Sequence, residues 1–158
     1  MIHAIRQPGL WSYAMSLKTI PTIHEFPHKQ TITTRWRDND VYGHVNNVVY
    51  YSWFDTAVNG YLLEQRALDF KKGEIVGLVV ETRCNYFKPV AFPDKIVTGV
   101  AVSKIGNSSV RYEVGIFKGE ETDACAAGHF VHVYVDAESH KPVPVSGKLR
   151  TVLANIQR

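Results

Sequence analysis

Cysteine is scarce in this chain of 158 residues, which contains only Cys84 and Cys125. Both lie in strand-like stretches without the ligand spacing of a metal site, which favours two reduced thiols over a disulfide framework. His129 and His132 are three residues apart, so on a strand they point to opposite faces and do not form a metal pair. We therefore expect a cytoplasmic protein with no metal and no cofactor.

The chain also has little excess charge of either sign. The chain has 18 lysines and arginines against 15 aspartates and glutamates, a formal net charge of +3, and it contains no run of four or more basic residues. A nucleic-acid-binding surface needs a denser basic patch. The small positive excess instead favours an anionic small-molecule ligand, and we expect no nucleic-acid partner.

Long apolar runs are absent, because no stretch approaches the ~18 residues of a transmembrane helix, and we expect no membrane partner. Hydrophobic residues make up 45% and charged residues 21% of the chain, which is typical of a globular domain. We predict one domain at residues 25–158, preceded by a loosely structured extension at residues 1–24. The extension lacks acidic residues and faintly resembles a transit peptide, although Pro8 and Pro21 argue against one; Met15 is a candidate internal start.

The spacing of apolar residues predicts one long helix between a first strand and a set of later strands. Residues 28–37 alternate with a period of two, which indicates a half-buried strand. From Asn46 the apolar residues recur at helical spacing. We expect this helix to end near Phe70, because Lys71, Lys72 and Gly73 suit a helix C-terminus.

The remaining segments are strand-like, at residues 74–90, 94–106, 108–119 and 123–136. Turn residues at 106–108 and 119–121 predict hairpins and an antiparallel meander. Residues 146–157 are predicted as a short helix with Ser146 as its N-cap. The whole pattern is α+β, with a curled antiparallel sheet of about five strands around one helix. We expect its open edge, or the polar helix face at residues 52–59, to be covered by a second subunit.

Polar residues are concentrated where the first strand meets the helix, in DNDVYGHVNNVVYYSWFD, residues 38–55. Asn46 or Asn47 suits the helix N-cap. A cap needs only one polar side chain, which leaves Asp40, Gly43 and His44 unexplained. Asp38 is expected to cap or to pair with a nearby arginine, Arg35 or Arg37.

The same residues suit acyl transfer. The N-terminus of a helix stabilises negative charge and can polarise a bound carbonyl oxygen. An aspartate on the preceding loop can attack that carbonyl or activate a water, and Gly43 permits close backbone approach or a positive φ. A carboxylate and an oxyanion site aimed at one place are the parts of an acyl-transfer centre.

This stretch resembles the signature of the hotdog-fold acyl-CoA thioesterases, the 4-hydroxybenzoyl-CoA thioesterase family, in which D-x-D-x-x-G-H-V-N-N-x-x-Y is common. HVNN is also similar to a motif of the plant acyl-ACP thioesterases. NYFKPVAFPDKI and HVYVDAESHKPVPV extend the resemblance, which covers roughly Lys29 to Leu153. It implies a hotdog fold, hydrolysis of an acyl-CoA thioester, CoA as part of the substrate, and a homodimer or homotetramer.

Position by position, the resemblance implies that Asp40 is the catalytic aspartate and that the backbone N–H of Asn47 polarises the thioester carbonyl. Some bacterial members have histidine where this chain has Asn47. That difference leaves a backbone role intact but calls a side-chain role in acid catalysis into question. His44 and Asn46 are the neighbours expected to orient water or the carbonyl, with Gly43 in the same loop.

The substrate-binding residues are predicted less sharply. Tyr50, Trp53 and Phe54 suit the core better than an acyl pocket, although Tyr50 is close enough to the helix start to line the site. Asp55 and Asn59 lie on the polar helix face. The resemblance also implies which residues contact CoA: Phe87, Lys88, Pro89, Lys104, Gly106, Ser108, Ser109 and Arg111. Of these, Lys104 or Arg111 suits the phosphates.

Three alternatives stay open. In another branch of the fold the acid comes from the helix, where Asp55 would be the base. A hydratase or dehydratase would use a histidine with a carboxylate, a pair that His44 and Asp40 imitate. A non-catalytic acyl-CoA binding module would hold the ligand without cleaving it.

Overall fold

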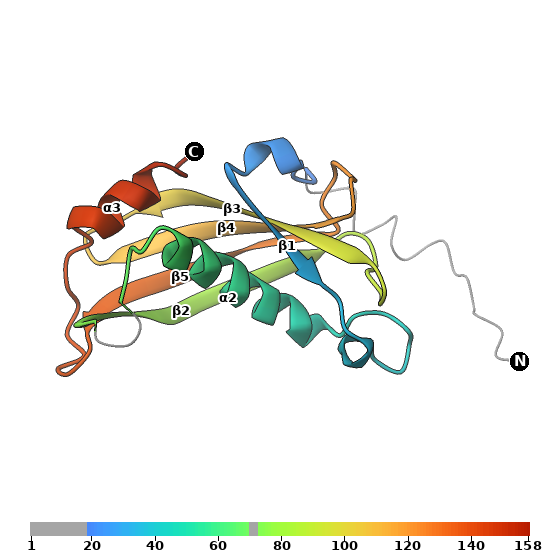
Figure 1. The fold of residues 1–158 in the computed structure, drawn as a ribbon, viewed down its shortest axis with the longest axis horizontal. Coiled ribbons are helices and arrows are strands. Elements are labelled where there is room, and N and C mark those ends of the chain that lie inside the picture. The colour runs from blue at the N-terminus through green and yellow to red at the C-terminus, as the bar shows by residue number, and fades with distance from the viewer. Residues whose placement is uncertain (1–18, 70–72) are drawn as a thin grey trace, which may run out of the picture.

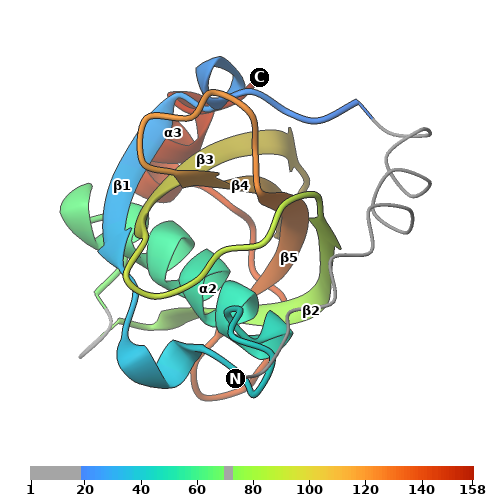
Figure 2. The same ribbon diagram turned by 90° about the vertical axis from the view of Figure 1, so that its right-hand side faces the viewer.

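The computed structural model describes residues 19–69 and 73–158, and its five strands form one antiparallel sheet that curls around a long helix (Figure 1). Seen along the sheet, the helix lies inside the curve (Figure 2). The predicted α+β hotdog fold is confirmed. In chain order, the elements are β1 (His28–Thr33), α2 (Asn47–Glu64), β2 (Ile75–Tyr86), β3 (Lys95–Ile105), β4 (Ser109–Lys118), β5 (Ala126–Asp136) and α3 (Gly147–Ala154).

The strand order is β1-β3-β4-β5-β2, so the predicted meander is right for β3, β4 and β5 and wrong for β2. β2 pairs with β5 at the opposite edge of the sheet from β1. The reason is the connection at residues 87–94, which is too long for a tight hairpin and crosses the end of the sheet (Figure 2). Periodicity alone does not encode which edge a strand joins.

Helix α2 ends at Glu64, not near Phe70 as predicted. Arg66 has a positive φ of 49°, and the chain turns there. The N–H of Arg66 donates to the carbonyl of Leu63, and the N–H of Ala67 to that of Leu62, both at 2.9 Å, which is a Schellman ending. Residues past the turn, such as Leu68, still pack on the core. The apolar spacing in the sequence therefore runs on beyond the true end of the helix, which made the predicted helix too long. Residues 70–72 lie outside the described residues.

Two other predicted boundaries need correction. β1 stops at Thr33, because the chain turns into a 3₁₀ helix at Trp36–Asp38. Ser146 does precede α3, but its side chain makes no capping hydrogen bond.

The sheet separates two apolar clusters. The larger cluster fills the concave side and contains the buried face of α2, with Phe54, Ala57 and Val58 fully buried. The smaller cluster lies on the outer face around Phe26 and Phe117. Within residues 19–69 and 73–158, no helix is both long and apolar enough to cross a membrane.

The segment before β1 packs on this outer face. The N–H of Ile23 donates to the carbonyl of Thr122 at 2.9 Å, and the carbonyl of Pro21 accepts from Ala124 at 3.0 Å. Of the extension expected at residues 1–24, residues 20–23 therefore contact the loop between β4 and β5 and the outer cluster. Residues 1–18, with the transit-peptide comparison and Met15, lie outside the described residues.

Phe26 reaches the sheet through a pair of glycines. Gly99 of β3 and Gly115 of β4 are cross-strand partners. A Cβ on Gly99 would lie 2.6 Å from the Phe26 side chain, and one on Gly115 would lie 2.9 Å from its ring. The missing side chains leave the hollow in which the ring packs.

Arg66→Gly should stabilise the protein. A left-handed conformation costs an L-residue roughly 1–2 kcal/mol, and the greater freedom of glycine in the unfolded chain offsets part of the gain. We expect the free energy of unfolding, measured by urea denaturation, to rise by about 0.5–1 kcal/mol. Arg66→Ala keeps the Cβ and is the matched control, so an equal gain in both variants would contradict the argument.

Candidate active site

Asp38 anchors the loop between β1 and α2. Its side chain is only 2% exposed. Oδ2 accepts from the Arg35 N–H at 2.7 Å, and Oδ1 accepts from Arg35 Nε at 3.1 Å and forms an ion pair with Nη2 at 3.0 Å. The predicted capping and pairing role is confirmed, with Arg35 as the partner. This carboxylate is therefore committed to structure.

Asp40 opens a tight turn that ends at His44. Its N–H donates to the His44 carbonyl at 2.8 Å, and its carbonyl accepts from the Gly43 N–H at 3.1 Å. Gly43 has a φ of +81°, which favours glycine there. Asp40 Oδ1 accepts from the Tyr42 N–H at 2.8 Å. No described residue binds Oδ2, which leaves this oxygen available to a substrate or a water.

Of the two asparagines, Asn46 is the cap of α2. Its Oδ1 accepts from the Val48 N–H at 3.1 Å, and its carbonyl accepts from the Val49 N–H at 3.0 Å. Asn47 is the first helical residue. Its N–H belongs to the first turn, where the helix itself offers no acceptor. By capping the helix, Asn46 thus fixes the position of the N–H groups of the first turn, which starts at Asn47.

A cleft of about 240 Å³ opens between this loop, the start of α2 and the end of β2. Of the predicted residues, it brings together Asp40, His44 and Asn47 with Tyr50, Lys88 and Pro89, and Val45 and Tyr86 complete its lining. Residues far apart in sequence thus share one site.

Tyr86 is a lining residue that the sequence did not single out. Its hydroxyl donates to the Asn47 carbonyl at 3.3 Å, and its ring meets Tyr50 edge-on at 5.0 Å between centroids. The available signal was its place beside Phe87 and Lys88 in NYFKP. Period-two alternation puts Tyr86 and Phe87 on opposite faces, so the cleft receives Tyr86 and not Phe87.

Burial raises the pKa of Tyr50 and that of Tyr86 above the ordinary tyrosine value. Both hydroxyls therefore remain protonated at neutral pH and can donate hydrogen bonds. Lys88 Nζ lies 3.0 Å from Glu121 Oε2, and this hydrogen bond raises the pKa of Lys88. The cleft thus contains a carboxylate, two protonated phenols, of which Tyr86 already donates to the Asn47 carbonyl, and an ammonium group oriented by Glu121.

The other predicted residues lie elsewhere. Asn59 Nδ2 donates to Asp55 Oδ1 at 2.9 Å, about two helical turns beyond Asn47, and neither residue lines the cleft. Phe87 and Arg111 line a groove on the outer face of the sheet.

The predicted hairpin residues lie at the far end of β3. Gly106 donates its N–H to the Ser109 carbonyl at 2.7 Å, and the Ser108 carbonyl accepts from the Tyr134 N–H at 2.7 Å. β3 has 11 residues and begins beside the loop of Asp40. It places this hairpin, with Lys104, on the order of 30 Å from Asp40 in the same chain.

Residues 34–153 match the family model of the Thioesterase-like superfamily. This chain belongs to that superfamily. The PA5185 protein of Pseudomonas aeruginosa strain PAO1 is 52% identical, with a TM-score of 0.86 over 88% of this chain and 97% of that one. YsmA of Bacillus subtilis (strain 168) is 27% identical over 114 residues, which are 71% of this chain and 75% of YsmA.

A thioesterase of Thermus thermophilus, whose structure is a complex with coenzyme A and Zn, is 28% identical to this chain. Its TM-score is 0.65 over 81% of this chain and 98% of that one. The prediction of a thioester hydrolase is thereby confirmed. The narrower resemblance to the 4-hydroxybenzoyl-CoA thioesterase family stays a prediction.

The thioesterase has a second, more enclosed cavity of about 110 Å³ between the C-terminal half of α2 and the start of β2. His132 lines it, is 2% exposed, and has no described hydrogen-bond partner on either ring nitrogen. Burial lowers the pKa of His132 to about 4, against a smaller opposing effect of Asp55. Gly77 leaves room for the ring, since a Cβ there would lie 3.1 Å from His132 Nδ1.

The thioesterase should lose stability in mild acid because of His132. Its pKa is about 4 when folded and about 6.5 when unfolded, so the unfolded chain binds this proton first as the pH falls. The resulting loss is about 2 kcal/mol between pH 7 and pH 5. His132→Phe should remove that part of the pH dependence of the free energy of unfolding, measured by urea denaturation.

The matched control is His24→Phe at an exposed position, which leaves His132 in place and should keep the wild-type slope. An unchanged slope in His132→Phe would show that this histidine does not carry the effect.

Proposed function

We propose that this thioesterase hydrolyses an acyl-CoA to the free acid and CoA, with Asp40 as nucleophile or general base and the backbone N–H of Asn47 as oxyanion donor. The observation that supports it is the cleft in which Asp40, with one oxygen unbound by described residues, lies beside the first turn of α2. Hydrolysis needs a nucleophile or general base next to hydrogen-bond donors that stabilise the oxyanion. The Asp40 carboxylate and the first N–H groups of α2 could fill these two roles.

In the proposed reaction the thioester oxygen faces the first turn of α2, where helix N–H groups stabilise the charge that develops on it. Asp40 Oδ2 either attacks the carbonyl carbon or takes a proton from the water that attacks it. The C–S bond then breaks and its electron pair leaves with sulfur. The thiolate takes a proton, from water in the first route and from the protonated Asp40 in the second. In the first route a second water cleaves the acyl-aspartate intermediate.

The neighbouring residues have separate proposed tasks. His44 lines the cleft and orients the water, while Asn46 acts indirectly by holding the helix start in place. Lys88 and Pro89 meet the part of CoA next to the sulfur. The coenzyme A bound by the Thermus thermophilus relative supports CoA as the leaving group. Lys104 and the hairpin at 106–109 would contact CoA only if a second subunit brings them to this cleft.

A homodimer is part of the proposal. β2 pairs with β5 on one side, and its other side is a sheet edge with three consecutive exposed apolar residues, Leu78, Val79 and Val80. The register shifts at this point, between Val79 and Glu81. An apolar edge of this kind readily pairs with a second chain, and two copies related by a twofold axis would bury the same patch on each other.

Neither rival activity fits the cleft as well. A hydratase would need a histidine–carboxylate pair, but Asp40 accepts from the Tyr42 N–H, and its turn meets His44 through the backbone. A binding module would leave the thioester intact. Thiol release measured with a thiol reagent distinguishes hydrolysis from both rivals, because only hydrolysis yields free CoA from acyl-CoA. Loss of enoyl absorbance without thiol release would instead indicate a hydratase, and intact recovery of the bound acyl-CoA a binding module.

Asp40→Asn should lower kcat for acyl-CoA hydrolysis at least about 100-fold, because an amide neither attacks the carbonyl nor accepts a proton. The assay is thiol release over short, long and aromatic acyl-CoAs, with circular dichroism to confirm folding. Asp55→Asn is the matched control and should stay near the wild-type rate. Full turnover by the first variant and none by the second would transfer the role to Asp55.

Val80→Lys should convert the dimer to a monomer, since it places a charge on the apolar edge of β2. Mass is measured by size-exclusion chromatography with light scattering. Thr31→Lys makes the same change on β1, at the other edge of the sheet, and should leave the dimer intact. A wild-type chain that is monomeric, or dissociation by Thr31→Lys alone, would refute this interface.

A further inference from the structure

The enclosed cavity of about 110 Å³ between the second half of α2 and the start of β2 has His132 of β5 in its wall. Most of the wall is apolar and comes from Leu62, Leu68, Ile75 and Val76. We propose that this cavity is a second binding site, for an apolar group that carries a hydroxyl. The imidazole of His132 is the hydrogen-bond partner of that hydroxyl.

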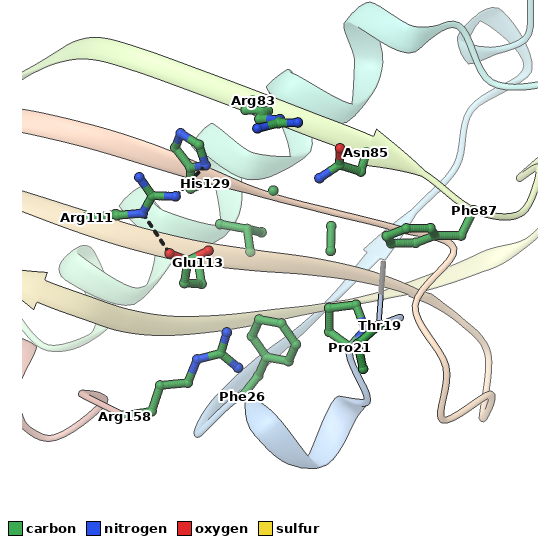
Figure 3. Close-up of a pocket in the computed structure, with 13 residues that line it drawn as sticks. Thr19, Pro21, Phe26, Arg83, Asn85, Phe87, Arg111, Glu113, His129 and Arg158 are labelled. Carbon is green, nitrogen blue, oxygen red and sulfur yellow. Dashed lines mark hydrogen bonds and ion pairs between the residues drawn. The ribbon is translucent and has the colours of Figure 1, made fainter. Parts of the chain in front are cut away.

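The two histidines of β5 differ in their hydrogen bonding. His129, on the outer face of the sheet, is paired on both nitrogens: Arg111 Nη2 lies 2.8 Å from Nδ1 (Figure 3), and Nε2 is hydrogen-bonded to Glu81. His132 is 2% exposed and has no partner among the described residues on either nitrogen. Buried polar groups are normally paired, and a ligand in the cavity would pair this one.

The packing around His132 does not by itself require a histidine. Its ring lies against the rings of Tyr112, Phe130 and Tyr134, at centroid distances of 5.2, 5.4 and 6.2 Å. A phenylalanine ring suits such surroundings, and it would avoid the destabilising effect of unpaired buried nitrogens. The imidazole is therefore better explained by a partner that enters the cavity.

Water alone is a poor filling for this cavity. A buried water makes about three hydrogen bonds, and a space of this size would hold several waters. Apart from His132, the described wall has two polar side chains. Asn59 already donates to Asp55, and the Tyr134 hydroxyl pairs with that of Tyr112 at 2.6 Å. A mainly apolar ligand with one polar group matches this wall better.

The charge around His132 favours a neutral ligand. Burial lowers the pKa of His132 to about 4, so at neutral pH the ring has one nitrogen that donates and one that accepts. A hydroxyl can pair with either nitrogen. A charged group would lose its hydration in this cavity, and a carboxylate would in addition be repelled by Asp55, whose charge acts on His132.

Gly77 of β2 opens the space in front of the imidazole. A Cβ at this position would lie 3.1 Å from His132 Nδ1 and 3.1 Å from the Tyr134 ring. A glycine inside a strand often marks a place where another group approaches closely. The cavity is somewhat smaller than the ~150 Å³ apolar cavity that binds benzene in another protein, so it suits one ring or a short chain end.

The cavity and the Asp40 cleft lie at opposite ends of α2 and β2. The cleft adjoins Asn47 and Tyr86, and the cavity adjoins Asn59 and Gly77. Asn47 and Asn59 are separated by about 18 Å along the helix. The hydroxylated group can therefore be a free small alcohol or phenol, or the far end of a long acyl chain whose thioester lies in the cleft. The second form rests on the function proposed above.

The test is calorimetric titration of the full chain with phenol and with benzene, which share the ring and differ in the hydroxyl. The wild type should bind phenol saturably. His132→Leu is close to histidine in volume and removes both nitrogens, so the affinity for phenol should fall at least about fivefold relative to that for benzene. His24→Leu makes the same change at an exposed position and should keep the wild-type ratio.

Gly77→Ala narrows the cavity but keeps the nitrogens, so it should weaken both ligands and leave their ratio unchanged. Circular dichroism confirms that each variant is folded. No saturation by phenol at millimolar concentration would show that water alone fills the cavity. That result, an equal ratio in wild type and His132→Leu, or unchanged phenol binding by Gly77→Ala would overturn the proposal.

Hydrolysis rates distinguish the two forms of the ligand. If the end of an acyl chain occupies the cavity, the wild type should have a higher kcat/KM for a long acyl-CoA with a terminal hydroxyl than for the same chain without it. His132→Leu should lose this preference, and His24→Leu should keep it. If a free alcohol occupies the cavity, His132→Leu should affect both chains equally while phenol binding still weakens. A protein that hydrolyses no acyl-CoA but binds phenol through His132 would refute the proposed function and support this site.

Discussion

Helix α2 is apolar on most of its surface, and the rest of the fold follows from the need to cover it. Residues such as Phe54 and Val58 are completely buried, in one cluster with the concave side of the curled sheet and with α3. Because the helix lies along the sheet, its first turn emerges at one end (Figure 1). The polar groups of the chain are concentrated there because water or a ligand must satisfy the first N–H groups.

The sequence was sufficient where the relevant interactions are local. The strand segments, the two hairpins and the loop from Asp40 to His44 follow from periodicity, turn residues and a short motif. The same signals narrowed the helix cap to Asn46 or Asn47, and the structure shows Asn46. The family resemblance predicted Lys88 and Pro89 as CoA contacts, and both line the cleft of Asp40. These residues line or support one cleft because the loop and the end of β2 meet at the start of α2.

Long-range pairing accounts for what could not be predicted. The edge that β2 joins depends on the path of residues 87–94, and the end of α2 depends on the turn at Arg66, past which apolar residues still pack on the core. The contribution of Tyr86 to the cleft and the assembly of Arg83, His129 and Phe26 into a groove need the register of β2 against β5 and the packing of the chain before β1.

The alternation of β2 has a consequence for how this protein can vary. Tyr86 lines the cleft and Phe87 lines the groove on the other face of the sheet. Which face each ring occupies depends on whether the number of preceding strand residues is odd or even. A single insertion between Glu81 and Tyr86, beyond the register shift at Val80, would exchange the two rings between the faces and damage the cleft and the outer cluster together. Insertions and deletions are therefore tolerated in the loops. In β2, a deletion would need a second change in length that returns each side chain to its original face of the sheet.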